Sequence, residues 1–151
     1  MKNLNVGTRL TILIAVSVLA LALWTHVVWA WMYATRLPAV AASKMKLDPN
    51  APRGEQMATL PARVRWKADN YNHLMEQPTV FYAVALATAL IAPLDHVAVI
   101  LAWGYVGLRV VHSLVQSLVN IIPLRFVLFA LSSITLIVLT VRTAAVFASV
   151  R

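Results

Sequence analysis

The chain has 151 residues, of which 61% are hydrophobic and 12% charged, and its net charge is +8. Globular proteins are about 45–50% apolar and about 25% charged, so the composition excludes a soluble globular protein and indicates an integral membrane protein. Because the sequence has no cysteine, it also excludes a disulfide, a protein thiolate nucleophile and a Cys-ligated metal, and any thiol must come from a ligand.

Four apolar runs, each close to the roughly 20 residues that cross a bilayer, predict four spanning helices. The first run resembles a signal peptide, but its apolar core of about 24 residues exceeds the typical 7–15, so we expect it to span. The length leaves no room for a separate soluble domain. We expect residues 1–151 to form a single all-α membrane domain, a four-helix bundle. Its spans are expected at 10–34, 63–93, 96–119 and 122–147, with a cytoplasmic connection at 37–62.

Basic residues are unevenly divided between the two faces that four alternating spans create. By the positive-inside rule, the richer face, which holds the first and third connections, is expected in the cytoplasm, with both termini outside. The positive charge then reflects topology and attraction to anionic lipid rather than nucleic-acid binding. The richer face has Arg36, Lys44, Lys46, Arg53, Arg63, Arg65, Lys67, Arg109 and Arg125, and the other has Lys2, Arg9, Arg142 and Arg151.

The second predicted span begins with a polar stripe. The stripe consists of Arg65, Asp69, Asn72 and Glu76. These residues are spaced 4, 3 and 4, which places them on one face of a helix.

A proline lies inside the same span. Pro78 predicts a kink that frees backbone carbonyls near Leu74 to accept hydrogen bonds from other donors.

The third predicted span carries a second polar stripe along an otherwise apolar helix. Ionisable groups inside a membrane helix usually face a bundle interior or a wet cavity and mark function. Because the cytoplasmic ends of all four spans lie at one depth, we expect both stripes, Arg36 and Arg125 to converge on one polar pocket. The alternative is structural: basic residues at helix ends snorkel to headgroups, and polar pairs hold helices together. The stripe consists of Tyr105, Arg109, His112, Gln116 and Asn120.

Other site chemistries are not indicated. The four histidines lie at different depths along the predicted spans, so no metal site is expected. The sequence shows no Ser-His-Asp ordering and no glycine-rich phosphate loop.

Two segments carry a resemblance to a known family. In RVRWKADNYNHLMEQPTVF, residues 63–81, basic residues precede an Asn, a Glu, a Pro and an aromatic residue. In LRVVHSLVQSLVNIIPLRFVLF, residues 108–129, an Arg-x-x-His stretch precedes an Arg that opens the last helix. With four spans and a long first connection, the chain resembles the MAPEG superfamily, the membrane-associated proteins in eicosanoid and glutathione metabolism. It differs from well-known members in the four-residue spacing of Asn72 and Glu76, and in Gln116, where tyrosine is common.

The resemblance implies a homotrimer that binds glutathione as co-substrate between protomers. It assigns Arg125 to the catalytic, thiol-activating position, where its charge adds to the positive end of a helix dipole. A thiol pKa lowered from about 8.5 by about two units corresponds to roughly 2.7 kcal/mol. The ligand contacts that it implies are Arg36, Arg65, Lys67, Asn72, Glu76, Arg109, His112 and Gln116.

Three functional classes remain open. The first is a membrane glutathione transferase or peroxidase-like enzyme, whose lipophilic electrophile or hydroperoxide would arrive from the bilayer along a groove between helices. The second is a non-catalytic lipid- or ligand-binding scaffold, and the third is a structural membrane subunit. The expected partners are the lipid bilayer, further copies of the chain and a small hydrophobic substrate. The termini carry no evident retention signal, which favours a bacterial inner membrane.

Overall fold

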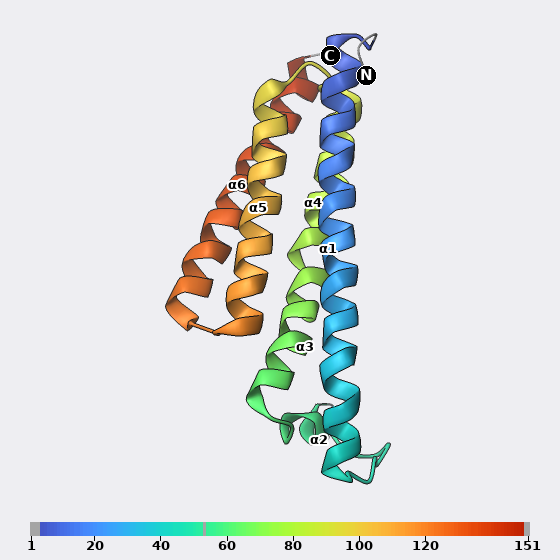
Figure 1. The fold of residues 1–151 in the computed structure, drawn as a ribbon. Helices are drawn as coiled ribbons and strands as arrows, with labels where there is room; N and C mark the ends of the chain where they lie inside the picture. The colour runs from blue at the N-terminus through green and yellow to red at the C-terminus, as the bar shows by residue number, and fades with distance from the viewer. Residues whose placement is uncertain (1–3, 53, 150–151) are drawn as a thin grey trace.

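A computed structural model describes residues 4–52 and 54–149, and within these residues the chain is helical with no strand. Four helical segments are long and apolar enough to cross a membrane, so the chain is a multi-pass integral membrane protein. The expected all-α four-helix bundle is confirmed (Figure 1). Lys2, Arg53 and Arg151, counted above, lie outside the described residues. The spans are α1 (Val6–Ser43), α3 and α4 together (Ala62–Met75 and Gln77–Ile91), α5 (His96–Leu118) and α6 (Ile122–Ser149).

The first helix is longer than the sequence analysis predicts. Asn5 caps α1 by accepting a hydrogen bond from the Thr8 N–H at 2.8 Å, and the helix continues past Pro38 to Ser43. A proline removes one backbone hydrogen bond, yet α1 remains continuous through Pro38. The connection expected over 37–62 therefore begins inside α1, and it also contains the short helix α2 (Glu55–Ala58).

The helices form a bundle whose two ends differ. The start of α1 and the end of α6 lie at one end, and α2 lies at the other (Figure 1). The core lies where α1, α4 and α5 meet, and the ring of Phe81 stacks on that of Tyr105 at 4.5 Å between centroids. The α1 and α3 helices extend past the α5–α6 turn toward α2, so the α2 end of the molecule is built by α1, α2 and α3.

The second span is interrupted at Glu76. The backbone there leaves the helical region, with φ −91° and ψ −95°, and α4 starts anew at Gln77 with Pro78 in its first turn. Proline favours this position because the first turn of a helix does not use its N–H groups internally. At the end of α3, the carbonyl oxygen of His73 accepts a hydrogen bond from Nη2 of Arg109 at 2.6 Å. The kink is thus where the sequence indicates, and the carbonyl that takes an outside donor is that of His73.

An ion pair joins the α4–α5 turn to α6 at the opposite end of the bundle. Asp95 accepts a hydrogen bond from Nε of Arg142 at 2.5 Å and another from the Ala98 N–H at 3.0 Å, which caps α5. Burial alone would raise the pKa of the Asp95 carboxyl, but the hydrogen bonds from Arg142 and Ala98 outweigh it and hold the pKa below its usual value.

We expect Asp95→Asn to lower the melting temperature of the detergent-solubilised protein slightly at neutral pH, since an ion pair with an exposed arginine contributes little to stability. Asparagine can still cap α5, so the loss reports the charge. A carboxyl with a lowered folded-state pKa stabilises the protein above its unfolded value of about 3.9, and this contribution is lost as the pH falls through the folded pKa. Melting curves of the variant and wild type should differ at neutral pH and converge in acid. Equal melting temperatures at neutral pH would show that the pair contributes nothing.

Candidate functional site

The α3 helix turns toward the bundle a face that the sequence analysis did not select. Its buried residues are Lys67, Asn70 and Leu74. At 3.6 residues per turn, the predicted stripe lies on roughly the opposite side of α3 from Lys67. The stripe residues are all exposed in the protomer: Arg65, Asp69, Asn72 and Glu76.

The α5 stripe, in contrast, faces the interior. Tyr105, Arg109, His112 and Gln116 are all buried, and the side chains of Arg109 and Gln116 are only 1% and 0% exposed. Asn120, the last residue of the predicted stripe, lies beyond α5 in the turn to α6. A polar stripe on an apolar helix must avoid lipid, which explains why this half of the prediction agrees with the packing.

Arg109 is buried without a counter-ion. Its Nη2 donates to the His73 carbonyl at 2.6 Å, and its guanidinium carbon lies 5.8 Å from the centre of the Phe129 ring. Its Nε and Nη1 are buried and have no hydrogen-bond partner. Among the described residues, no carboxylate lies within 4.0 Å of it, and Glu76 acts on it only through longer-range electrostatics. Such a group is costly unless a ligand supplies the missing acceptors.

Gln116 and His112 complete the buried cluster. The Oε1 atom of Gln116 lies 3.0 Å from Nδ1 of His73, whereas its Nε2 is buried with no partner. The ring of His112 lies 6.1 Å from that of His73 and 6.3 Å from that of Phe129. His112 also interacts electrostatically with Arg109 and Arg125. The cluster therefore joins α3, α5 and α6.

Arg125 lies in the first turn of α6, as expected for an arginine that opens the last helix. Its Nη1 donates to Oδ1 of Asn120 at 2.5 Å, and its Nε is buried without a partner. Asn120 has a positive φ of 53°, a left-handed conformation that asparagine tolerates better than most residues. The turn therefore uses Asn120 both to reverse the chain and to hold the guanidinium.

Asn70 is a buried polar residue that the sequence analysis missed. Its Nδ2 donates to the hydroxyls of Ser113 at 2.6 Å and Ser117 at 3.0 Å, which ties α3 to α5. The sequence contains a pattern that could have identified it. Lys67, Asn70 and Leu74 are spaced 3 and 4 and so lie on one face of α3, and the two serines are four residues apart and so lie on one face of α5. The sequence offered two competing stripes on one polar helix, and only packing distinguishes them.

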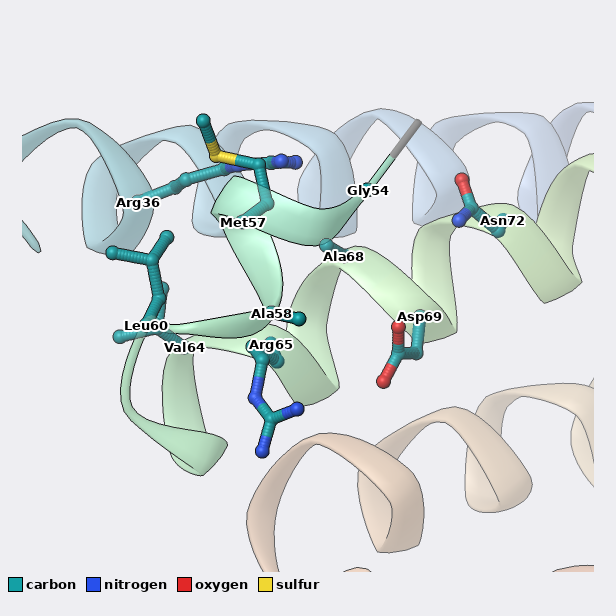
Figure 2. Close-up of a pocket in the computed structure, with 10 residues that line it drawn as sticks. All are labelled: Arg36, Gly54, Met57, Ala58, Leu60, Val64, Arg65, Ala68, Asp69 and Asn72. Carbon is teal, nitrogen blue, oxygen red and sulfur yellow. The ribbon is translucent and has the colours of Figure 1, made fainter. Parts of the chain in front are cut away.

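A second group of predicted residues lies apart from the buried cluster. Arg36, Arg65 and Asn72 line a pocket of about 240 Å³ between α1, α2 and α3, together with Asp69 and apolar residues of the connection. Figure 2 shows Arg36 reaching from α1, while Arg65 and Asp69 project from one side of α3. Because Asn70 pairs with Ser117 in the last turn of α5, the eight residues of α3 before it, 62–69, extend α3 about 12 Å past this contact.

Lys67 belongs to neither group. Its Nζ donates to the Arg63 carbonyl at 2.6 Å and lies 5.3 Å from the centre of the Trp31 ring. This lysine packs α3 against α1, and its hydrocarbon stem is buried while the ammonium has a carbonyl and a ring as partners. Within one protomer, the expected single pocket is therefore divided into two parts. One is the buried cluster of Arg109, His112 and Gln116, called the α5 cluster below, and the other is the pocket lined by Arg36, Arg65 and Asn72, called the α2-end pocket.

The α5 cluster is rich in hydrogen-bond donors that lack acceptors. Buried unpartnered donors occur on Arg109, Gln116 and Arg125, whereas among the side chains that the structure describes the buried unpartnered acceptor is Oδ1 of Asn70. An excess of buried cationic and amide donors suits a ligand with carboxylate or carbonyl oxygens. Within residues 4–52 and 54–149, no group of three or more His, Asp or Glu side chains is placed to hold a metal.

The comparison with protein families agrees with the helical membrane fold. The sequence model of the MAPEG family matches residues 14–145, which includes most of each spanning helix. No curated protein and no solved structure matches the chain. Since the match covers nearly the whole sequence, the chain belongs to the MAPEG family.

Proposed function

We propose that this protein binds glutathione and activates its thiol for attack on a lipophilic electrophile or hydroperoxide. The observation that carries the proposal is the set of buried donors on Arg109, Gln116 and Arg125 that have no acceptor in the protein. Glutathione has two carboxylates and two amide carbonyls, which supply acceptors of the required kind. Members of the MAPEG family generally use glutathione, and membership of the family supports this ligand over other anions.

The outward-facing stripe of α3 supports a site that is completed between protomers. Glu76 is exposed in the single chain, so it can enclose a ligand only when another chain covers that face, and Asn72 is exposed on the same face of α3. We propose a homotrimer in which Arg36, Arg65 and Asn72 bind carboxylate and amide groups, and Glu76 binds the ammonium group. Arg109, His112 and Gln116 contact the ligand from the buried side. Lys67 is left out, because its ammonium is already partnered within the protomer.

Arg125 is the proposed catalytic residue. It lies in the first turn of α6, where the helix dipole is positive, and its Nε has no acceptor. A thiolate beside this guanidinium would be stabilised relative to the thiol, which lowers the pKa of the bound ligand and makes it a nucleophile at neutral pH. Once the thiolate has formed, its attack on the electrophile needs no protein side chain to act as an acid or a base.

The second substrate is proposed to reach the site from the bilayer. A groove of about 290 Å³ lies between α4 and α6, and its lining is mostly apolar, with Gln77 and Ser133 among its polar groups. Gln77 donates to the Ser133 hydroxyl at 2.7 Å, and Tyr105 of α5 donates to Gln77 at 3.4 Å. The groove is thus an apolar surface for a lipophilic molecule, and one of its ends lies at Gln77, which contacts Tyr105 of α5.

The proposed orientation follows from charge. The α2 end of the molecule carries most of the basic side chains, and it would face the cytoplasm, with both termini outside. A bacterial inner membrane is the proposed location. Protease protection of tags placed at either terminus in sealed vesicles would show the orientation directly.

Titration of the purified protein with glutathione tests the function. We expect a saturable ultraviolet absorbance from bound thiolate at neutral pH, and none with S-methylglutathione, which binds in the same way but has no ionisable thiol. Both ligands should raise the melting temperature. If neither changes absorbance or melting temperature, the proposal fails, and a lipid-binding scaffold without thiol activation becomes the better account.

A further inference from the structure

His73 contacts both buried donor groups of the α5 cluster, although the sequence analysis gave it no role. Its carbonyl oxygen accepts from Nη2 of Arg109 at 2.6 Å, and its ring Nδ1 lies 3.0 Å from Oε1 of Gln116. Each of these two partners is buried and retains nitrogen donors that no protein group satisfies. His73 is the point on α3 at which two otherwise separate α5 side chains are held.

The contact between His73 and Gln116 determines which end of the Gln116 amide remains free. The amide oxygen can only accept, so Nδ1 of His73 must carry the proton and donate it to Oε1. The amide nitrogen of Gln116 is then the atom left for a ligand, and it is buried without a partner. The reverse arrangement, with Nδ1 unprotonated and the amide rotated, would instead offer the ligand an oxygen acceptor.

The contact with Arg109 is made through the backbone of the same residue. Because the second span breaks at Glu76, α3 ends at Met75, which places His73 in its last turn, where the carbonyls have no partner within the helix. The His73 carbonyl holds one nitrogen of the guanidinium, while Nε and Nη1 remain free. A substitution of the His73 side chain leaves this carbonyl in place, so the two contacts can be separated by mutation.

We propose that His73 is a positioning residue that orients Gln116 as a donor, so that the cluster selects a ligand group with acceptor oxygens, such as a carboxylate. Arg109 and Gln116 then present donors to the same group, and an amide or ester in place of the carboxylate loses part of this recognition. The inference rests on the proposed function in one respect: it takes the carboxylate to be one of those of glutathione.

The test compares two replacements that differ in the ring donor. His73→Gln keeps an N–H that can donate to Gln116, whereas His73→Phe keeps a flat ring of similar size without a donor. With S-methylglutathione as the probe, we expect the Phe variant to bind about tenfold more weakly, the typical effect of one lost buried hydrogen bond, and the Gln variant to bind within about threefold of wild type. Melting curves of both variants check that they fold.

A double-mutant cycle separates positioning from a general packing effect. In a Gln116→Leu background there is no amide to orient, so His73→Phe should weaken binding no further. Equal binding by His73→Phe and wild type, or equally weak binding by both His73 variants, would overturn the inference. A loss that is the same in both backgrounds would also overturn it, because the effect would then bypass Gln116.

The nitrogen chemical shifts of His73 provide a measurement that needs no ligand. We expect the tautomer with the proton on Nδ1, and a proton only on Nε2 would overturn the inference whatever the protein binds. If wild type fails to bind S-methylglutathione while the Nδ1–H tautomer is observed, the failure lies with glutathione as the ligand. The orientation of Gln116 would then stand, and other carboxylates would replace glutathione as probes in the same cycle.

Discussion

Replacement of Arg125 by leucine is expected to abolish the thiolate absorbance of bound glutathione and to lower kcat about 100-fold at a pH below the lowered pKa of the bound thiol, about 6.5. The factor corresponds to about two pKa units of thiol activation, or roughly 2.7 kcal/mol. Affinity for S-methylglutathione should change by less than about threefold, since that ligand has no thiolate for Arg125 to stabilise. The measurement is a pair of titrations, by absorbance and by calorimetry, followed by turnover of a lipophilic electrophile.

Arg142→Leu is the matched control for this experiment. Arg142 is an arginine on the same helix, but it lies near the opposite end of α6 and pairs with Asp95. We expect the control to keep the absorbance band and kcat. If Arg125→Leu retains the band, thiol activation at this residue is excluded, and Arg125 is left with its observed role in holding Asn120 at the α5–α6 turn.

The α5 half of the site could be predicted from sequence because only one face of that helix is polar. Arg109, His112 and Gln116 recur every three or four residues among valines and leucines, so lipid on the outside leaves the interior as their only place. The start of α6 was predictable for a similar reason, since Arg125 follows a turn and a proline. The burial of the α5 stripe and the place of Arg125 at the start of α6 thus follow from the sequence and the membrane alone, without knowledge of neighbouring chains.

The α3 half could not be oriented from sequence alone. Its first turns carry polar residues on all sides, with Lys67 and Asn70 on one side and Arg65 and Asp69 on the other. The spacing of polar residues therefore does not decide which of these two faces is buried. Burial of Asn70 is decided by two serines on α5 that are distant in sequence. The division of the site into two parts has a similar origin, since the distance by which α3 passes the end of α5 depends on where the two helices pack.

The role of His73 was also beyond the sequence, because half of it belongs to the backbone. A carbonyl oxygen is present in every residue, and what makes this one an acceptor for Arg109 is its place at the end of α3. Pro78 indicated that a kink would occur in this region. Which carbonyl would meet which donor depends on the register between α3 and α5.

Arg109→Met is expected to weaken binding of S-methylglutathione about 100-fold without destabilising the fold. The guanidinium has one hydrogen bond and two unpartnered nitrogens in a buried setting, so it is a net cost to the empty protein. Charged side chains at membrane depth cost on the order of 2.5–3.5 kcal/mol, and methionine fills a similar volume without charge. The melting temperature of the unliganded variant should therefore equal or exceed that of wild type, whereas the increase on adding ligand should be lost.

This opposite response of stability and binding distinguishes a ligand site from a structural clamp. If Arg109 existed to hold α5 to α3 through the His73 carbonyl, its removal would lower the melting temperature and leave binding nearly unchanged. Arg109→Lys supplies the matched comparison, because it keeps the charge but not the fork of donors. We expect Lys to restore only part of the affinity, since one ammonium cannot replace the two free nitrogens of the guanidinium on a carboxylate. A lysine variant that binds as tightly as wild type would mean that charge alone, and not the geometry set by His73, recognises the ligand.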